Sequence, residues 1–325
     1  MTYYRNVASV PSIDAIGHDS VSSRHGSAPQ VPAHVAVAAQ HYDNIDVSLE
    51  QDTGTYWCHM RPQGKPIVTN ALLRDLQVMQ STLPELFESA RGTGQKPFSY
   101  FVFASRAPGI YSLGGDLNYF AHCMTTGDRE SIHNYARTCV EVVHRNVNAF
   151  NLPVITMALV QGDALGGGFE TALSFDLIVA ERSAKMGLPE ILFNLFPGMG
   201  AYSFLSRRLD AARAQKMILS GRIYTAEELH EMGIVDVLAE DGQGEAAVAD
   251  YIERMAPKHN AQYALYQTRR RVNPVTWDEL RDVVDIWVDA VFQLSDADLR
   301  KMARLTNAQD RRLSRVTSVP AIAAE

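Results

Sequence analysis

Two mainly apolar runs of eight residues, FSYFVFAS (98–105) and PVITMALV (153–160), lie on either side of a long segment with helical spacing. Apolar runs of this length, bounded by turn formers or charges, are typical of buried strands. Residues 69–91 repeat leucine or methionine every three or four positions, and helices are likewise predicted over 116–124 and 130–150. Strands that alternate with helices predict an α/β fold with a mostly parallel sheet covered by helices.

The two ends of the chain carry different patterns from this centre. Residues 1–41 are rich in Ser, Ala, Pro and His without a sustained period, which predicts a mobile N-terminal arm. Residues 44–60 alternate apolar and polar positions around the turn DTG, so two paired strands are expected there. Beyond Pro197 the pattern is mainly helical, and Thr225 with Glu228 forms a capping box at a helix start.

One C-terminal helix is predicted in detail. Residues 277–294, WDELRDVVDIWVDAVFQL, repeat apolar residues at the period of an amphipathic helix. By default Trp287 is a core aromatic residue at this spacing. The face expected to be buried consists of Val283, Val284, Ile286, Trp287, Ala290, Val291 and Leu294.

Composition argues against several classes of protein. With 325 residues, 46% of them hydrophobic, the chain can bury a full core. A formal charge of -7 argues against nucleic acid as the main partner, and the arginine runs SRRL, TRRRV and DRRLSR are interpreted as solvated helix ends. No apolar run approaches the roughly 20 residues that cross a bilayer, and no leader pattern is present, so we expect a cytoplasmic protein without membrane contact. Cys58, Cys123 and Cys139 are too few and scattered for a disulfide framework or a metal site, and we expect them in the core.

Two glycine-rich junctions follow predicted strands and precede predicted helices. In VQGDALGGGFETAL the glycines Gly166, Gly167 and Gly168 lie where a helix would begin, and in IYSLGGDLNYF Gly114 and Gly115 do the same. Backbone N–H groups at a helix start lack intrahelical partners. Two such groups aimed at one carbonyl oxygen form an oxyanion hole. Taken alone, each glycine group favours a tight turn needed for packing, and the oxyanion hole is favoured because two similar junctions occur together with two acids.

Two acids accompany these junctions, Glu170 after the triple glycine and Glu190 in the segment LPE. Two carboxyl groups in an apolar pocket can be held in opposite protonation states, which suits general acid and base catalysis. The structural alternative is that Glu170 complements a helix dipole and Glu190 is a solvated cap. Asp116 is expected to cap the following helix. Asp163, close to the glycines, would oppose a developing negative charge unless it points to solvent.

These motifs resemble a known family. SLGGDLNYF, VQGDALGGGFETAL, MGLPEILFNLFPGMGAYSFLSRRL and AQKMILSGRIYTAEELHEMGIVD are similar, in this order, to the signatures of the crotonase (enoyl-CoA hydratase/isomerase) superfamily. GLPEILFNLFPGMGAYSF with DIWVDAVFQL and DLRKMARL most resembles its RpfF-type diffusible signal factor synthases. The resemblance implies a crotonase-like spiral of ββα units over residues 42–240. It also implies a helical C-terminal region, residues 241–325, that completes the acyl pocket and makes the contacts of a homotrimer.

The resemblance also implies roles for individual residues. Gly115 and Gly167 correspond to the oxyanion donors, and Glu170 and Glu190 to the catalytic acids. No metal and no organic cofactor is expected, because the acyl group arrives as a phosphopantetheine thioester on acyl carrier protein or CoA. In this resemblance Trp287 lines the acyl tunnel instead of serving only as a core residue. The residues implied to bind substrate are Gly114, Gly166, Gly198, Met199 and Trp287.

Three functions follow from these residues and from the resemblance. The first is synthesis of a cis-2-unsaturated fatty acid signal, by dehydration of a 3-hydroxyacyl thioester and hydrolysis of the thioester. Removing a proton beside a thioester creates an enolate, so one glutamate would serve as base, the other as acid, and the glycine N–H groups would stabilise the charge. The alternatives are an ordinary enoyl-CoA hydratase or isomerase, and a non-catalytic protein that binds an acyl thioester or a sensor domain.

Overall fold

The computed structural model of the 325-residue chain describes residues 31–317. The chain separates into two units, Met1–Val31 and Pro32–Glu325, and every helix and strand described here belongs to the second unit. Of the mobile arm predicted for residues 1–41, residues 1–30 lie outside the described part. The residues that follow form the short helix α1 (Ala33–Ala38), whose Val37 is buried in the core.

Six strands form the larger sheet, in the order β1-β2-β3-β5-β7-β10. They are β1 (Ile45–Glu50), β2 (Thr55–Met60), β3 (Tyr100–Ser105), β5 (Ile155–Val160), β7 (Leu177–Glu181) and β10 (Val237–Ala239). The predicted hairpin is confirmed, because β1 and β2 pair antiparallel around Gly54, whose φ of +63° suits a tight turn. The other neighbouring strands are parallel, as the alternation of strands with helices predicts.

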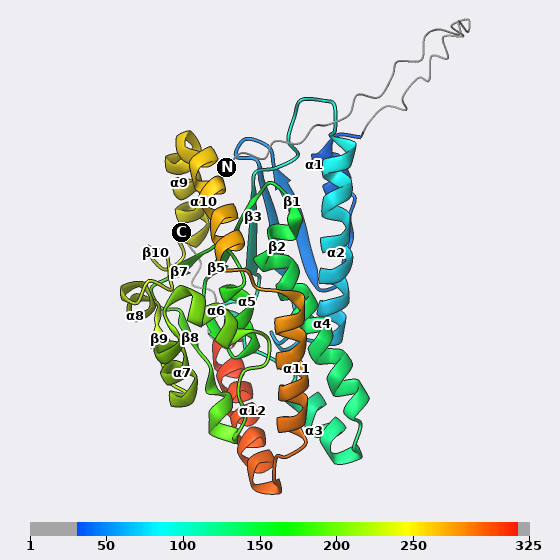
Figure 1. Ribbon diagram of the computed structural model, residues 1–325, viewed down its shortest axis with the longest axis vertical. Helices are drawn as coiled ribbons and strands as arrows, with labels where there is room; N and C mark the ends of the chain where they lie inside the picture. The colour runs from blue at the N-terminus through cyan, green and yellow to red at the C-terminus, as the bar shows by residue number, and fades with distance from the viewer. Residues whose placement is uncertain (1–30, 318–325) are drawn as a thin grey trace, which may run out of the picture. The chain divides into compact units, whose positions relative to one another are not determined.

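The larger sheet is buried on both faces, which explains why β3 and β5 read as continuous apolar runs. On one face Phe101, Phe103 and Ala158 belong to the core formed with α2 (Asn70–Ser89) and α4 (Arg129–Val147). On the other face Val102 and Met157 pack with α9 (Gly244–Met255). Figure 1 shows the sheet between these two sets of helices, with α10 (His259–Val272) beside α9.

A smaller sheet brings together the segments that the motifs singled out. Its order is β4-β6-β8-β9, with β4 (Ile110–Ser112), β6 (Asp163–Leu165), β8 (Lys185–Gly187) and β9 (Ile223–Thr225). Strands β4, β6 and β8 are parallel neighbours, whereas β9 is antiparallel to β8. Because the carboxyl ends of parallel strands meet at one edge, the residues that follow β4, β6 and β8 become spatial neighbours.

Side-chain caps fix the starts of several helices where the sequence predicts them. Thr69 accepts a hydrogen bond from the N–H of Leu72 at the start of α2. Asp116 accepts one from the N–H of Tyr119 and caps α3 (Leu117–Thr126), as predicted. The capping box of Thr225 and Glu228 is also confirmed, at the start of α8 (Ala226–Glu231). These caps satisfy backbone donors that would otherwise be unpaired in the first helical turn.

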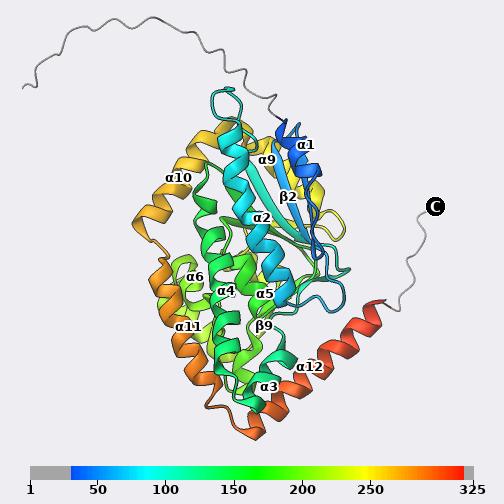
Figure 2. The same ribbon diagram turned by 90° about the vertical axis from the view of Figure 1, so that its right-hand side faces the viewer.

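The C-terminal half is mainly helical, as predicted, apart from the short strands β9 and β10. Figure 2 shows that α11 (Trp277–Val291) lies along α4 and that α12 (Asp296–Thr317) lies against α3, and the contacts between these pairs agree. Helix α12 also contacts the 3-10 helix η2 (Pro189–Phe193), which contains Glu190. The remaining helices are α5 (Gly167–Leu173), α6 (Ala201–Arg208), α7 (Ala211–Ser220), and the 3-10 helices η1 (Ala149–Asn151) and η3 (Ala256–Lys258).

The predicted buried face of α11 is confirmed only in part, because Val283 and Ala290 are half-buried and Leu294 lies beyond the last residue of the helix. Val284, Trp287 and Val291 are buried as expected, but Ile286 is 60% exposed. With 3.6 residues per turn, Ile286 lies about 100° away from Trp287 around the helix. The buried face is therefore narrower than the apolar pattern suggests.

The interpretation of all arginine runs as solvated helix ends is also wrong. Arg208, in the run SRRL, and Arg270, in the run TRRRV, have side chains only 13% and 16% exposed. Arg269 and Arg270 both bind Asp176, a carboxylate that is 1% exposed and follows α5 in the chain. The side chains of residues 311–315, in the third run, lie outside the described part.

The structure also bears on two expectations drawn from composition. All three cysteines are free and buried, as predicted. Among residues 31–317, none of the helices combines the length and the apolar character that a membrane crossing requires.

Candidate active site

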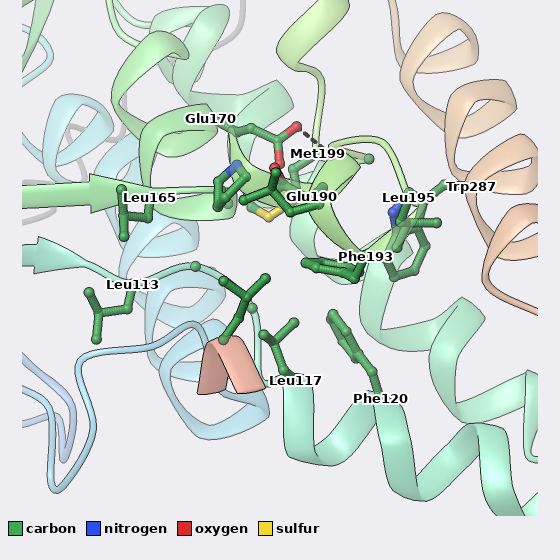
Figure 3. A pocket seen from close by; sticks show the side chains of 18 of the residues that line it. Leu113, Leu117, Phe120, Leu165, Glu170, Glu190, Phe193, Leu195, Met199 and Trp287 are labelled. Atoms are coloured by element: carbon green, nitrogen blue, oxygen red, sulfur yellow. Dashed lines mark hydrogen bonds between the residues drawn. The ribbon is translucent and has the colours of Figure 1, made fainter. Parts of the chain in front are cut away.

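All the residues predicted to form the site line one cavity of about 270 Å³. Figure 3 shows Glu170 and Glu190 together at one end of it, across from the apolar side chains Leu117, Phe120 and Phe193. The smaller sheet explains this arrangement, because β4, β6 and β8 end at the same edge and lead into these segments. The predicted residues in the lining are Gly114, Gly115, Gly166, Gly167, Glu170, Glu190, Gly198, Met199 and Trp287.

The two glycine junctions touch each other through their backbones. Gly114 has a φ of +91°, and a Cβ placed there would lie 2.8 Å from the carbonyl oxygen of Leu165 and 3.2 Å from the nitrogen of Gly167. A Cβ on Gly167 would lie 3.7 Å from the nitrogen of Gly115. In the described part of the chain, no acceptor is bonded to the N–H of Gly115 or Gly167. Two free N–H donors therefore lie close together in the cavity lining.

Gly168, the third glycine of the triplet, is explained by packing and not by a role as a hydrogen-bond donor. A Cβ on Gly168 would lie 2.4 Å from the carbonyl oxygen of Ser112, so only glycine lets α5 pack this closely on β4. The packing interpretation is therefore sufficient for Gly168. At Gly166 the neighbour is Glu190, because a Cβ there would lie 2.6 Å from Oε1 of that side chain.

Glu170 is a buried carboxyl group held by backbone donors. Its side chain is 2% exposed, and its Oε1 accepts hydrogen bonds from the N–H of Met199 at 2.7 Å and of Ala201 at 2.9 Å. Burial raises its pKa to about 7, and the two backbone donors oppose that rise because they stabilise the charged form. Since Ala201 is the first residue of α6, Glu170 also caps this helix, a structural role that the sequence did not indicate.

Glu190 has fewer partners than Glu170. It lies in the first turn of η2 after Pro189 and is partly buried, and its Oε2 is buried with no hydrogen-bond partner among the described residues. Burial, followed by the negative charge of Glu170, raises the pKa of Glu190 to about 8. The interpretation of Glu190 as a solvated cap is wrong, because this oxygen is inaccessible to solvent.

The rest of the cavity wall is apolar. Trp287 is 6% exposed, packs edge-on against Phe120 with ring centroids 5.5 Å apart, and would clash with a Cβ on Gly198 at 2.4 Å. It is thus both a core residue and part of the lining. Leu305 and Ala308 of α12 complete the wall. The sequence does not predict that these two residues line the cavity, because α12 is polar overall and its apolar residues form no motif that indicates ligand binding.

The sequence suggests that Asp163 either points to solvent or lies beside the oxyanion donors in the cavity, and the structure shows neither arrangement. Its side chain is 2% exposed, so it does not point to solvent, yet it is not among the residues that line the cavity. Its backbone N–H donates to the carbonyl of Gly109 at 3.1 Å, which fixes the start of β6. Among the described residues, no group of three or more His, Cys, Asp or Glu side chains is arranged to hold a metal ion.

Comparison with known proteins relates this site to a family. The model of one protein family, described as enoyl-CoA hydratase/isomerase, matches residues 65–308. Mouse mitochondrial methylglutaconyl-CoA hydratase is 33% identical over 181 residues, which is 55% of this chain and 53% of the mouse protein, so the match spans about half of that relative. The probable enoyl-CoA hydratase echA8 of Mycobacterium leprae is 33% identical over 220 residues, 66% of this chain and 77% of the bacterial protein.

Solved structures resemble the chain in fold. Human mitochondrial delta3-delta2-enoyl-CoA isomerase superposes with a TM-score of 0.67 at 16% identity, covering 83% of this chain and 99% of the human one. DspI of Pseudomonas aeruginosa has a TM-score of 0.57 at 24% identity, covering 76% of this chain and 98% of DspI. The predicted fold class is confirmed: two mixed sheets and C-terminal helices form an α/β crotonase fold.

Proposed function

The chain belongs to the enoyl-CoA hydratase/isomerase family, and we propose that it adds or removes water at the 2,3 double bond of an acyl thioester. One observation carries this proposal: a buried carboxyl group, a partly buried one and two free backbone N–H groups lie at one end of an apolar cavity. Hydration needs a base for water, an acid for C2 and donors for the thioester oxygen. The four groups match these needs.

The N–H groups of Gly115 and Gly167 would receive the thioester oxygen. When water attacks C3, negative charge moves from the double bond onto that oxygen and forms an enolate. Removing one donor of this kind typically slows catalysis by roughly 100- to 1000-fold. The left-handed φ of Gly114 and the contact between the two loops support this assignment, because they hold both donors without side chains between them.

The surroundings of the two acids suggest which is the base. Glu170 accepts two backbone hydrogen bonds that stabilise its charged form, so we assign it to take a proton from the attacking water. Glu190 has an unpartnered Oε2 and a more strongly raised pKa, so we assign it to deliver its proton to C2. The C3–O bond forms as the C2–C3 π bond opens, and the new C2–H bond quenches the enolate. In dehydration the same steps run in reverse.

The test is an assay of the purified chain with trans-2-enoyl-CoA thioesters of several chain lengths. Hydration removes the conjugated double bond, so the ultraviolet absorbance of the enoyl thioester should fall, and mass spectrometry should detect the 3-hydroxyacyl product. If no water is added to any chain length while the same thioesters bind, the protein is a non-catalytic acyl-thioester binder.

A second candidate is synthesis of a free cis-2-unsaturated fatty acid, which requires dehydration of a 3-hydroxyacyl thioester and then hydrolysis. The observation that favours it is the apolar wall contributed by Phe120 of α3, Trp287 of α11 and Leu305 of α12, which suits a medium or long acyl chain. This wall also supports the proposal that residues 241–325 complete the acyl pocket. Delivery on acyl carrier protein or CoA, trimer formation and binding of a sensor domain remain predictions from the resemblance.

The two candidates differ in what they release. Incubation with 3-hydroxyacyl thioesters on CoA and on acyl carrier protein should yield free cis-2-enoic acid and a free thiol if the second candidate holds. A hydratase alone would leave the thioester intact and give the trans-2-enoyl thioester. Mass spectrometry of the acyl product, together with titration of the released thiol, separates these outcomes for each carrier.

A further inference from the structure

A second cavity of about 270 Å³ lies at the opposite end of α6 from Glu170. Ala201 begins α6 and donates to Glu170, whereas Arg207 and Arg208 end the helix and line the second cavity. Eight residues of helix separate the two sites by roughly 12 Å along its axis. Arg269 and Arg270, in the last turn of α10, line the same cavity. Figures 1 and 2 both show α6 next to the junction between α10 and α11.

The positive charges in this cluster outnumber the negative ones. Asp176 lies 2.8 Å from Arg269 and 2.5 Å from Arg270, so one carboxylate serves two guanidinium groups. Arg207 forms a bidentate pair with Glu279, with contacts of 2.8 and 2.7 Å. Arg208 has only Asp236, at 3.7 Å, which is beyond hydrogen-bonding distance. Four cations thus share three carboxylates, and the uncompensated charge is closest to Arg208.

Arg208 also has hydrogen-bond donors that are not used. Each guanidinium has five N–H groups. Those of Arg207 are fully used by Glu279 and by the carbonyls of Ser203, Asn273 and Pro274. Arg208 uses two, on the carbonyls of Phe175 at 2.7 Å and Ile234 at 3.4 Å, and no other acceptor is bonded to it in the described part of the chain.

An almost buried cation with unused donors requires an explanation. The Arg208 side chain is 13% exposed, and burial lowers its pKa, with Asp236 opposing that change only in part. Buried polar groups are normally satisfied, and buried charges are normally paired. Arg270, whose side chain is 16% exposed, likewise keeps donors that no described residue accepts, whereas Arg269 is 44% exposed. All three arginines line the same cavity.

We propose that this cavity binds a tetrahedral oxyanion, as inorganic phosphate or as the phosphate group of a small organic molecule, between Arg208, Arg269 and Arg270. A phosphate oxygen accepts several charge-assisted hydrogen bonds, and guanidinium groups approaching from α6 and α10 match its tetrahedral shape better than a planar carboxylate. The C-terminal ends of α6 and α10 also meet the cavity, and their dipoles disfavour an anion. The binding energy must therefore come from the guanidinium groups.

The proposal is tested by titrating the full chain, without substrate, with inorganic phosphate at constant ionic strength. Calorimetry should show saturable binding to one site, and the melting temperature should rise with phosphate concentration because a ligand of the folded state stabilises it. Arg208→Gln should weaken binding at least tenfold. Arg213→Gln, an exposed arginine on α7 that is paired with Asp210, makes the same charge change and should leave binding unchanged.

Asp236→Asn provides a variant with the opposite expected result. It removes the carboxylate that competes for Arg208 but keeps an oxygen that can accept from the N–H of Ile178. Phosphate should bind several-fold more tightly to it. This variant keeps the proposal falsifiable if Arg208→Gln does not fold, and a rise in affinity excludes binding at a distant phosphate subsite.

Titrations with different anions decide both the chemical class of the ligand and whether it is a free anion or part of an organic molecule. Tighter binding of a phosphate monoester than of inorganic phosphate supports an organic ligand, and equal binding supports the free anion. Acetate that binds as tightly as phosphate would overturn the tetrahedral assignment. No saturable binding of phosphate to the wild-type chain, or binding that Arg208→Gln and Asp236→Asn leave unchanged, would overturn the site itself.

Discussion

Glu190 and Asp176 are both buried or partly buried acids, yet the protein surrounds them in opposite ways. Asp176 accepts hydrogen bonds from the N–H and hydroxyl of Thr156, at 3.0 and 3.2 Å, and ion pairs from Arg269 and Arg270. Oε2 of Glu190 has no partner among the described residues, and the like charge of Glu170 further raises the pKa of this carboxyl group. A fully paired carboxylate holds structure together, whereas an unpaired one can gain or lose a proton at neutral pH.

The comparison predicts that substitutions of the unpaired acids lower the hydration rate, whereas substitution of the paired acid lowers the unfolding free energy. Glu170→Gln and Glu190→Gln should each lower the hydration rate by about 100- to 10,000-fold, because each removes a proton-transfer group but keeps its size. The folded state should survive, since an amide oxygen at position 170 can still accept from Met199 and Ala201. The measurement is kcat/KM on enoyl-CoA beside a melting curve, with Glu231→Gln, exposed on α8, as the matched control.

Retention of more than about a tenth of wild-type activity by either variant would contradict the two-acid mechanism. Loss of activity with a collapsed melting temperature would instead make the residue structural. For Glu170 this second outcome has a specific basis, because its side chain caps α6.

Asp176→Ala should show the reverse pattern. The change leaves Arg269 and Arg270 without their carboxylate and removes the acceptor of Thr156, so the unfolding free energy should fall by about 3–5 kcal/mol. Denaturant titration measures this loss, and Asp250→Ala, an exposed aspartate on α9, is the control. Near the folding midpoint activity should fall only in proportion to the unfolded fraction. A loss below about 1 kcal/mol would show that Asp176 does not anchor α10.

The sequence predicts the larger sheet better than the smaller one. Strands β1 and β2 and helices α2, α3, α4 and α11 follow from sustained periods, and strands β3 and β5 follow from continuous apolar runs. Strands β4, β6 and β8 are three residues long, too short to carry a period, although they position Gly114, Gly166 and Glu190. The site residues were singled out by glycine and glutamate motifs and by the resemblance. Their roles remain predictions.

Other differences arise because long-range packing is invisible to a local pattern. Arg208 and Arg270 look like ordinary helix ends until the fold brings them to Asp236 and Asp176, which lie far away in the chain. Ile286 looks buried until the packing of α11 against α4 selects a narrower face. The contact of Glu170 with α6 likewise joins residues about thirty positions apart.

The smallest expected effect is a pH dependence of stability that separates the two acids further. Burial raises the pKa of Glu190 from its ordinary value of 4.5 to about 8, so the folded chain holds this proton more tightly than the unfolded chain. The resulting stability is fully present below pH 4.5 and is lost as the pH rises towards 8, because the folded state must then keep a proton or bury a charge. Glu190→Gln has no such loss.

The Gln variant should therefore gain stability over the wild type by up to about 1.36 kcal/mol for each pH unit between pH 5 and pH 8. Denaturant titrations of both proteins across this range measure the difference at each pH. A difference that stays constant from pH 5 to pH 8 would mean that Glu190 titrates like a solvated acid. In that case the unpartnered Oε2 of Glu190 would not explain its chemistry, and the contrast with Asp176 would rest on charge pairing alone.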